Sequence, residues 1–188
     1  EEEVIVHYRL TPSVSSLAQL KALAQVAFEK VPIHIKIETG MGRTGLLPQE
    51  VESFLEELAH HPQIYLEGIF THFAQARQGD PVTQKQWERF LVAVEKAEKM
   101  GWSIPYRHVC NSAATLDWPS MHLNMVRVGT VLYGQNPALA KNKLSLKDPW
   151  QLKARVVHLR EVPSGTAIGY GGDYVTKTSA PIAVIPLG

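Results

Sequence analysis

Polar side chains that could do chemistry recur where apolar, strand-like segments end. In functional α/β folds, such groups gather at the carboxyl ends of parallel strands. We therefore expect the four polar strand ends of this chain to lie side by side. They are Thr39 to Arg43, Thr71-His72, Asn111-Ser112 and Arg127 to Thr130.

Two cations lie within apolar, strand-like segments. Arg127 stands in "MVRVG", and a buried guanidinium requires a partner or a ligand, so we expect a functional site there rather than an ion pair in the core. Lys36 shares one face of the segment 33–38 with His34 and Glu38, because strand side chains alternate. The pattern leaves two interpretations of this face open, a site or a partly solvated sheet edge.

The other candidates each have a structural interpretation. A single histidine such as His72 is more often a hydrogen-bonded structural residue than a catalyst. Asn111-Ser112 precedes a helical pattern and could be an N-cap, a position whose amide groups also hold anions. Gly129-Thr130 offers backbone N–H groups for a phosphate. Tyr170 lies among glycines, and from the residues alone we expect it to pack across strands.

The stretch "HIKIETGMGRTGLLPQE" contains a G-x-G-x-x-G at Gly40, Gly42 and Gly45. In a dinucleotide fold the helix begins within the glycine turn and faces the pyrophosphate. Here Pro48 suits the first helical position, so the helix would begin after the turn. Glu67 lies near the offset expected for a ribose-binding carboxylate, but its strand continues past it. Dinucleotide binding is therefore only a minor alternative.

Composition narrows the function classes. The 188 residues carry 19 basic and 18 acidic side chains, so no charge excess directs the chain to nucleic acid or an anionic membrane. The single Cys110 excludes an internal disulfide framework and suits a reducing compartment. Neither a bilayer-length apolar run nor a signal-peptide pattern is present. Composition thus predicts a soluble, intracellular protein without a membrane or nucleic-acid partner, and we expect no metal site.

Strand-like and helical patterns alternate up to about residue 135, which predicts parallel βα units. The expected strands are 4–9, 33–38, 64–72, 106–110 and 125–129, with helices over 15–30, 48–60, 83–100 and 112–117. The helical period is clearest in 83–100, where one face carries Trp87, Phe90, Leu91, Val94 and Ala97.

From about Trp150 the helical period disappears. The segments 151–162 and 180–187 read as strands around a glycine-rich loop, and Pro- and Asn-containing stretches in 136–150 read as a linker. Five βα units are too few for an eight-stranded barrel, yet four polar strand ends suit a ring of loops better than a doubly wound sheet. We predict an α/β fold: a partial (β/α)8 barrel over 1–145 and the beginning of an all-β domain over 146–188.

Five blocks, in their order along the chain, resemble bacterial alanine racemases, pyridoxal-phosphate enzymes with a barrel followed by a β domain. The blocks are "HIKIETGMGRTG", "GIFTHFAQA", "HVCNSAATL", "MVRVGTVLYG" and "GTAIGYGGDYVT". The resemblance spans nearly the whole chain. It implies interconversion of L- and D-alanine by a cytoplasmic homodimer that supplies D-alanine for peptidoglycan. Abrupt ends and the missing Schiff-base lysine, which the family carries upstream, predict an inactive internal fragment.

The resemblance also implies a role for each candidate residue. The phosphate would be held by Asn111, Ser112, Gly129 and Thr130. Arg127 would face the pyridine nitrogen, within a hydrogen-bond chain that includes His72 and His108. Arg43 would lie near the cofactor oxygen and the substrate carboxylate, Lys36 would be a carbamylated lysine, and Tyr170 would be a catalytic base acting in the partner subunit's active site.

Two other functions fit parts of the same pattern. A serine-directed or broad-specificity racemase of the same family would differ in side-chain pocket residues that lie partly outside this segment. A non-catalytic pyridoxal-phosphate-binding barrel protein would lack the β domain. Residues 151–188, which include Tyr170, argue against that second alternative.

Overall fold

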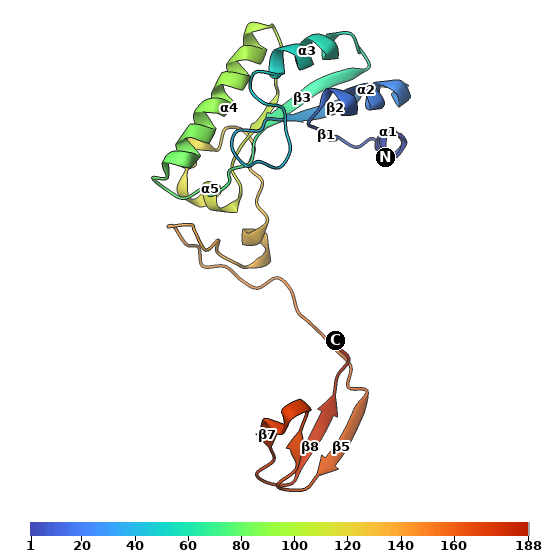
Figure 1. Cartoon of the computed structure of the whole chain (residues 1–188), viewed down its shortest axis with the longest axis vertical. Helices are drawn as coiled ribbons and strands as arrows, with labels where there is room; N and C mark the ends of the chain where they lie inside the picture. The colour runs from blue at the N-terminus through green and yellow to red at the C-terminus, as the bar shows by residue number, and fades with distance from the viewer. Residues whose placement is uncertain (188) are drawn as a thin grey trace. The chain divides into compact units, whose positions relative to one another are not determined.

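The computed structural model describes residues 1–187, which form two compact units (Figure 1). The first unit is Glu1–Pro149 and the second is Trp150–Gly188. This division falls within the segment 136–150 that reads as a linker. Within the described residues, no helix combines the length and the apolar character needed to cross a membrane.

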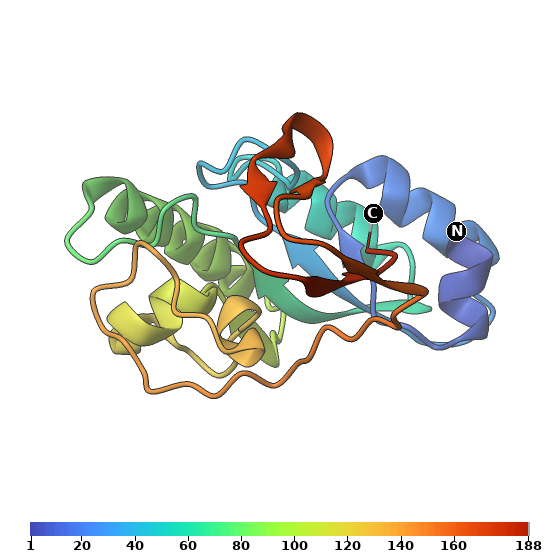
Figure 2. The same cartoon turned by 90° about the horizontal axis from the view of Figure 1, so that it is seen from below.

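The first unit is built on a parallel sheet with strand order β1-β2-β3-β4, and helices α2, α3 and α4 run along one side of it (Figures 1 and 2). The strands are β1 (Ser13–Val14), β2 (Val31–Lys36), β3 (Ile64–Phe70) and β4 (Tyr106–His108). The helices are α1 (Glu2–His7), α2 (Leu17–Val26), α3 (Val51–Ala59), α4 (Pro81–Lys99) and α5 (Ser112–Asp117), with short 3₁₀ turns η1 (Pro119–Met121) and η2 (Thr130–Tyr133). Sequential parallel strands alternating with helices confirm the predicted α/β units.

The side chains of strand β2 show that one face of the sheet is apolar and the other is polar. Ile33, Ile35 and Ile37 are fully buried and belong to the same core as residues of α3. The alternate positions, His34 and Lys36, point to the opposite face. Because β2 lies between β1 and β3, this polar face is not at a sheet edge, which leaves the site as its interpretation.

Helix α4 carries the longest buried stripe of the unit. Its N-cap is Asp80, whose carboxylate accepts the N–H of Thr83 at 3.0 Å, and Pro81 occupies the first turn. The predicted apolar face is wrong at Leu91, which is 41% exposed, whereas the polar Gln86 is 1% exposed. The stripe that faces the sheet is rotated from the predicted one and comprises Thr83, Gln86, Phe90, Ala93, Val94 and Ala97.

Two predicted strands of the first unit are wrong. Residues 4–9 contain most of helix α1, which has Glu2 and Glu3 in its first turn, where acidic groups favour the helix. The first strand follows it, at Ser13–Val14, and pairs with β2. Residues 125–129 form no strand; Arg127 N–H bonds to the Cys110 carbonyl at 2.9 Å, and this segment binds the sheet mainly through the Arg127 side chain.

Two of the predicted helices have different ends in the structure. Pro48 lies in a turn, and α3 begins three residues later, at Val51, instead of at the proline. Helix α2 is shorter than the predicted 15–30, while α5 matches 112–117. In all three cases the kind of element is as predicted.

Within residues 150–187, the second unit contains only short antiparallel strands and one 3₁₀ turn. Strand β5 (His158–Val162) pairs with β8 (Ala180–Val184), and β6 (Ala167–Ile168) pairs with β7 (Tyr174–Val175). The turn η3 (Tyr170–Gly172) joins β6 to β7. The all-β prediction is confirmed for the described residues, although residues 151–157 are not a strand.

Truncating a core side chain of α3 should destabilise the first unit. Leu55 is fully buried, so Leu55→Ala should lower the free energy of unfolding by about 2–5 kcal/mol. The matched control is Leu91→Ala at an exposed position of α4, with a loss of about 1 kcal/mol or less. Urea unfolding of the full-length variants measures both, and equal losses would contradict the assigned core.

Candidate active site

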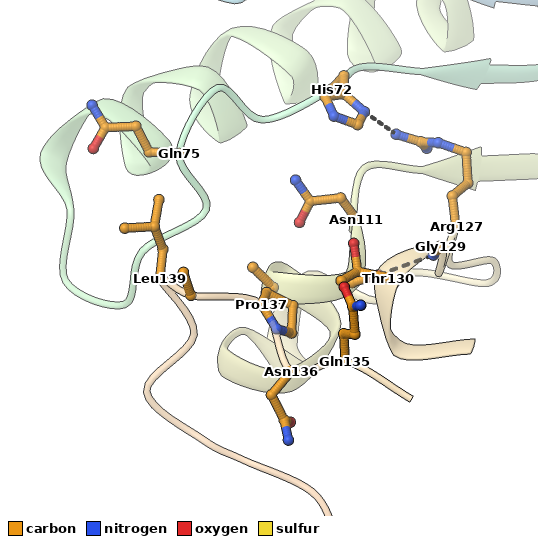
Figure 3. A pocket seen from close by; sticks show the side chains of 13 residues that line it. His72, Gln75, Asn111, Arg127, Gly129, Thr130, Gln135, Asn136, Pro137 and Leu139 are labelled. Carbon is orange, nitrogen blue, oxygen red and sulfur yellow. Dashed lines mark hydrogen bonds between the residues drawn. The ribbon is translucent and has the colours of Figure 1, made fainter. Parts of the chain in front are cut away.

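Three segments that are distant in sequence meet around a cavity of about 640 Å³ in the first unit (Figure 3). They are the loop after β3, the junction between β4 and α5, and the segment that leads into η2. The structure thus brings together six of the predicted site residues, His72, Asn111, Ser112, Arg127, Gly129 and Thr130. The volume is in the range of small-molecule sites, roughly 300–1,000 Å³.

Arg127 holds these segments together. One terminal nitrogen, Nη1, donates to His108 Nδ1 at 2.6 Å and to the His108 carbonyl at 3.0 Å. The other, Nη2, donates to the Thr71 carbonyl at 2.7 Å and reaches His72 Nδ1 at 3.4 Å (Figure 3). The guanidinium also lies over the Phe70 ring, 4.9 Å from its centroid.

The remaining N–H of Arg127, on Nε, donates to no acceptor within residues 1–187. Burial lowers the pKa of Arg127 to about 10, so it stays protonated near neutral pH. The cavity is therefore lined by a fixed cation that has one donor left for a ligand. An acceptor of modest basicity, such as an aromatic ring nitrogen, suits that donor because Arg127 keeps its proton.

A line of hydrogen bonds runs from Arg127 through two histidines to a carboxylate. His108 Nε2 lies 2.8 Å from His34 Nδ1, and His34 Nε2 lies 3.2 Å from Glu67 Oε2. Arginine can only donate, so His108 Nδ1 accepts and the His108 proton is on Nε2. The same argument puts the His34 proton on Nε2, facing Glu67. Arg127 at one end of the line and Glu67 at the other thus require the same tautomers of His108 and His34.

Charge and burial keep both histidines next to Arg127 neutral. Burial, with the Arg127 charge adding to it, lowers the pKa of His108 to about 3. Burial also lowers the pKa of His72, with further contributions from the charges of Arg127, Arg43 and Lys36. His72 can therefore accept from Arg127 and keep a ring N–H for another partner.

The junction between β4 and α5 supplies a polar wall of the cavity. Asn111 caps α5 by accepting the Ala114 N–H at 3.0 Å, as the N-cap interpretation expected. Ser112 Oγ accepts the Gly129 N–H at 2.9 Å and so fixes the start of η2. The Ser112 hydroxyl proton stays available to an anion.

The glycine-rich loop after β2 already contains an anion. Glu38 accepts the N–H groups of Gly40 and Met41, both at 2.6 Å, and that of Arg43 at 3.2 Å. Burial alone would raise the pKa of Glu38, but these backbone donors lower it overall. A Cβ at Gly45 would lie 2.7 Å from the Glu38 backbone nitrogen, so glycine is required there. The loop therefore binds a side chain of its own chain in the position a phosphate would take.

Lys36 and Arg43 lie near each other on this side of the sheet. Lys36 is 5% exposed and donates to Thr44 Oγ1 at 2.7 Å. Burial lowers the pKa of Lys36, and the charge of Arg43 lowers it further. Arg43 is exposed. A buried amine with a lowered pKa is neutral more often than an ordinary lysine and is thus a better nucleophile.

Tyr170 belongs to the second unit. Its side chain is fully exposed, and it lies between Gly169 (φ 76°) and Gly171 (φ 76°). Within residues 150–187 the ring does not pack across strands, so the packing expected from the residues alone is wrong for this unit.

Two groups were missed as site residues. Glu67 was weighed only against a dinucleotide, and Gln86 was left out because its helix face was misassigned. A signal for Gln86 existed: positions 83, 86, 90, 93, 94 and 97 share a face at helical spacing. For Glu67 the signal was the polar alternation across neighbouring strands, which pairs His34 with Gly68.

Comparison with known proteins decides the family. Residues 1–137 match the family described as alanine racemase, N-terminal domain, and residues 150–188 match alanine racemase, C-terminal domain. The chain belongs to the alanine racemase family. Alanine racemase 1 of Oceanobacillus iheyensis is 42% identical, over 97% of this chain and 50% of that protein. The chain thus spans about half the length of the curated relatives it matches.

Solved alanine racemase structures share the fold. An alanine racemase of Clostridium difficile 630 is 36% identical with a TM-score of 0.85, covering 100% of this chain and 50% of that one. The structure from E. faecalis is 32% identical with a TM-score of 0.81, covering 100% of this chain and 52% of that one. The resemblance drawn from the five sequence blocks is confirmed, and so is the partial barrel followed by a β domain.

The hydrogen-bond line predicts a specific state for His108. Ring ¹⁵N spectra of the full-length protein should show a neutral ring with its proton on Nε2 between about pH 5 and 7. The exposed His7 provides the reference signal. An unfolded histidine binds a proton below about pH 6.5, while native His108 does so only near 3, so this residue lowers stability as pH falls through that window. A proton on Nδ1, or a doubly protonated ring in that range, would contradict the assignment.

Proposed function

We propose that the protein carrying this sequence is a pyridoxal-phosphate-dependent racemase that interconverts L- and D-alanine. The observation that supports it most is Arg127, a fixed cation in the cavity wall with one donor unused within residues 1–187. Its family membership supports the same reaction.

The cavity's donor set fits pyridoxal phosphate. Ser112 offers a hydroxyl proton and Thr130 a backbone amide at the start of η2, a suitable pair for a phosphate, and the Gly129 N–H orients the Ser112 hydroxyl by donating to its oxygen. Arg127 would donate to the ring nitrogen. When bound, pyridoxal phosphate spreads the negative charge that forms as the substrate Cα loses its proton.

The chain's own residues would control that chemistry through charge. Arg127 retains its proton because its pKa of about 10 lies well above neutral pH, so it would donate to the ring nitrogen without protonating it. His72 and His108 support this by staying uncharged. Arg43, exposed near the site, would bind the substrate carboxylate.

Racemisation requires one base on each side of the substrate, and we propose that Tyr170 is one of them. A phenol with a reference pKa near ~10 becomes an effective base near cations, which favour the phenolate. Full exposure on a glycine-flanked turn leaves its oxygen free to act in another subunit. This arrangement would require a homodimer in which each Tyr170 reaches the partner's site.

The remaining assignments follow from the same proposal. The enzyme would act in the cytoplasm and supply D-alanine for peptidoglycan. The barrel domain would end near residue 145 and the β domain would begin at 146. The basic test is racemisation of L-alanine by the full-length protein, with L-serine as the comparison substrate. Equal or faster turnover of serine would replace alanine as the proposed substrate.

Removing the Tyr170 hydroxyl should affect the two enantiomers differently. In the full-length protein, Tyr170→Phe should slow Cα-proton exchange from L-alanine by about 10²- to 10⁴-fold, the usual contribution of a general base. Exchange from D-alanine should continue through the second base. Deuterium incorporation from solvent, measured on each enantiomer separately, distinguishes the two. A small and equal effect on both would make Tyr170 a packing residue.

Lys36 should react with carbon dioxide. Its buried amine, with a lowered pKa, would form a carbamate by adding to CO₂ and releasing a proton. The resulting anion would remove the repulsion between Lys36 and Arg43. The full-length protein in ¹³C-bicarbonate should give a carbamate carbon signal that Lys36→Arg abolishes, while Lys21→Arg, at an exposed position, retains it. A signal that survives Lys36→Arg would place the carbamate elsewhere.

A further inference from the structure

The side chain of Gln86 connects helix α4 to the ends of two strands. It lies in the first half of the helix and is 1% exposed. Its Nε2 donates to Thr39 Oγ1 and to the His72 carbonyl, both at 3.1 Å, and its Oε1 accepts the Ala74 N–H at 2.9 Å. Both amide protons and the amide oxygen are therefore used on the loops that follow β2 and β3.

From Thr39 the hydrogen bonds continue across the two strand ends in one direction. The Thr71 hydroxyl donates to the Ile37 carbonyl at 2.8 Å, so it must accept from Thr39 Oγ1, 2.7 Å away. Thr39 in turn accepts from Gln86. The carbonyl of the same Thr71 accepts from Arg127 at 2.7 Å. One amide on α4 thus fixes a residue that binds Arg127 directly.

The start of the glycine-rich loop packs against the same side chain. A Cβ at Gly40 would lie 3.3 Å from Gln86 Cγ, so the loop backbone comes very close to the glutamine. Arg89, three residues further along α4, donates to the Thr39 carbonyl at 2.9 Å. Together they determine where the loop leaves β2 toward Arg43.

A polar side chain is costly in a buried helix stripe unless all its groups are bonded. An apolar residue of similar length would fill the same space on the core face of α4. Gln86 instead makes three hydrogen bonds, and each goes to a loop that carries a candidate site residue. None goes to the helix itself.

We propose that Gln86 is a positioning residue that fixes the strand ends carrying Arg43 and His72 and, through Thr71, the guanidinium of Arg127. Its effect on catalysis rests on the racemase function proposed above, whereas its effect on the loops does not. The Gln86 side chain is buried between α4 and the two loops and does not line the cavity, so we assign it no part in the proton transfers.

The effect on the loops is tested by hydrogen exchange in the full-length protein. Gln86→Met keeps the length of the side chain and removes its hydrogen bonds. The Ala74 amide should then exchange at least about tenfold faster, because its acceptor is lost, and the amides of 39–45 should follow. Gln84→Met is the control, since Gln84 is exposed on the same helix and its side chain bonds only to Glu88, at 3.2 Å.

The effect on catalysis is tested well below the unfolding temperature of each variant. Misplacing a catalytic group by about 1 Å can cost on the order of 100-fold, so Gln86→Met should lower kcat by about 10- to 100-fold with a smaller change in KM. Thr39→Val, which cuts the line of hydrogen bonds but leaves Gln86 in place, should lower kcat in the same direction. It also serves as the second variant if Gln86→Met does not fold.

The outcomes separate the two proposals. Unchanged exchange at Ala74 in Gln86→Met, or faster exchange with unchanged kcat in an active enzyme, overturns the positioning role and makes Gln86 a packing residue. A wild-type protein that racemises no amino acid overturns the proposed function instead. In that case the exchange rates alone decide whether Gln86 holds the two loops.

Discussion

A single guanidinium links the segments that form the candidate site. Arg127 comes from a stretch with no regular structure, yet its nitrogens bind groups at the ends of β3 and β4. A buried cation must find acceptors, and here the acceptors are carbonyls and neutral rings instead of a carboxylate. The charge is therefore shared among several uncharged acceptors and is not neutralised. That leaves the cavity with a positive wall suited to an anionic or electron-rich ligand.

This choice of partners controls the protonation of the surroundings. Each ring nitrogen that faces Arg127 must present a lone pair, so His108 and His34 have one allowed tautomer each. A carboxylate appears only at the far end, on Glu67, where it accepts the last proton of the line. Each hydrogen bond in such a line polarises the next one. Glu67 therefore strengthens the bond between Arg127 and His108 without contacting Arg127.

The sequence predicted what local patterns and side-chain types determine. Alternating isoleucines placed β2, and polar strand ends anticipated the cavity residues from His72 to Thr130. Residues 4–9 were misassigned because a short apolar run fits a strand or a helix equally well, and tertiary contacts decide. Residues 125–129 were predicted as a strand, but this segment contacts the sheet mainly through the Arg127 side chain, whereas a strand would pair through its backbone. Helical spacing could have indicated that Gln86 is buried, but its bonding partners lie on loops 12 to 47 residues away, which no local pattern contains.

The glycine-rich loop after β2 has a wider consequence for motif searches. Its amides point at Glu38, so the loop carries its own counter-ion. To bind these amides, a nucleotide phosphate would have to displace the Glu38 carboxylate, which is part of the same chain and so is always present beside them. The acidic residue two positions before the first glycine therefore distinguishes this loop from a phosphate-binding one. In a glycine-rich motif, an acidic residue that binds the loop amides is therefore as informative about ligand binding as the glycines themselves.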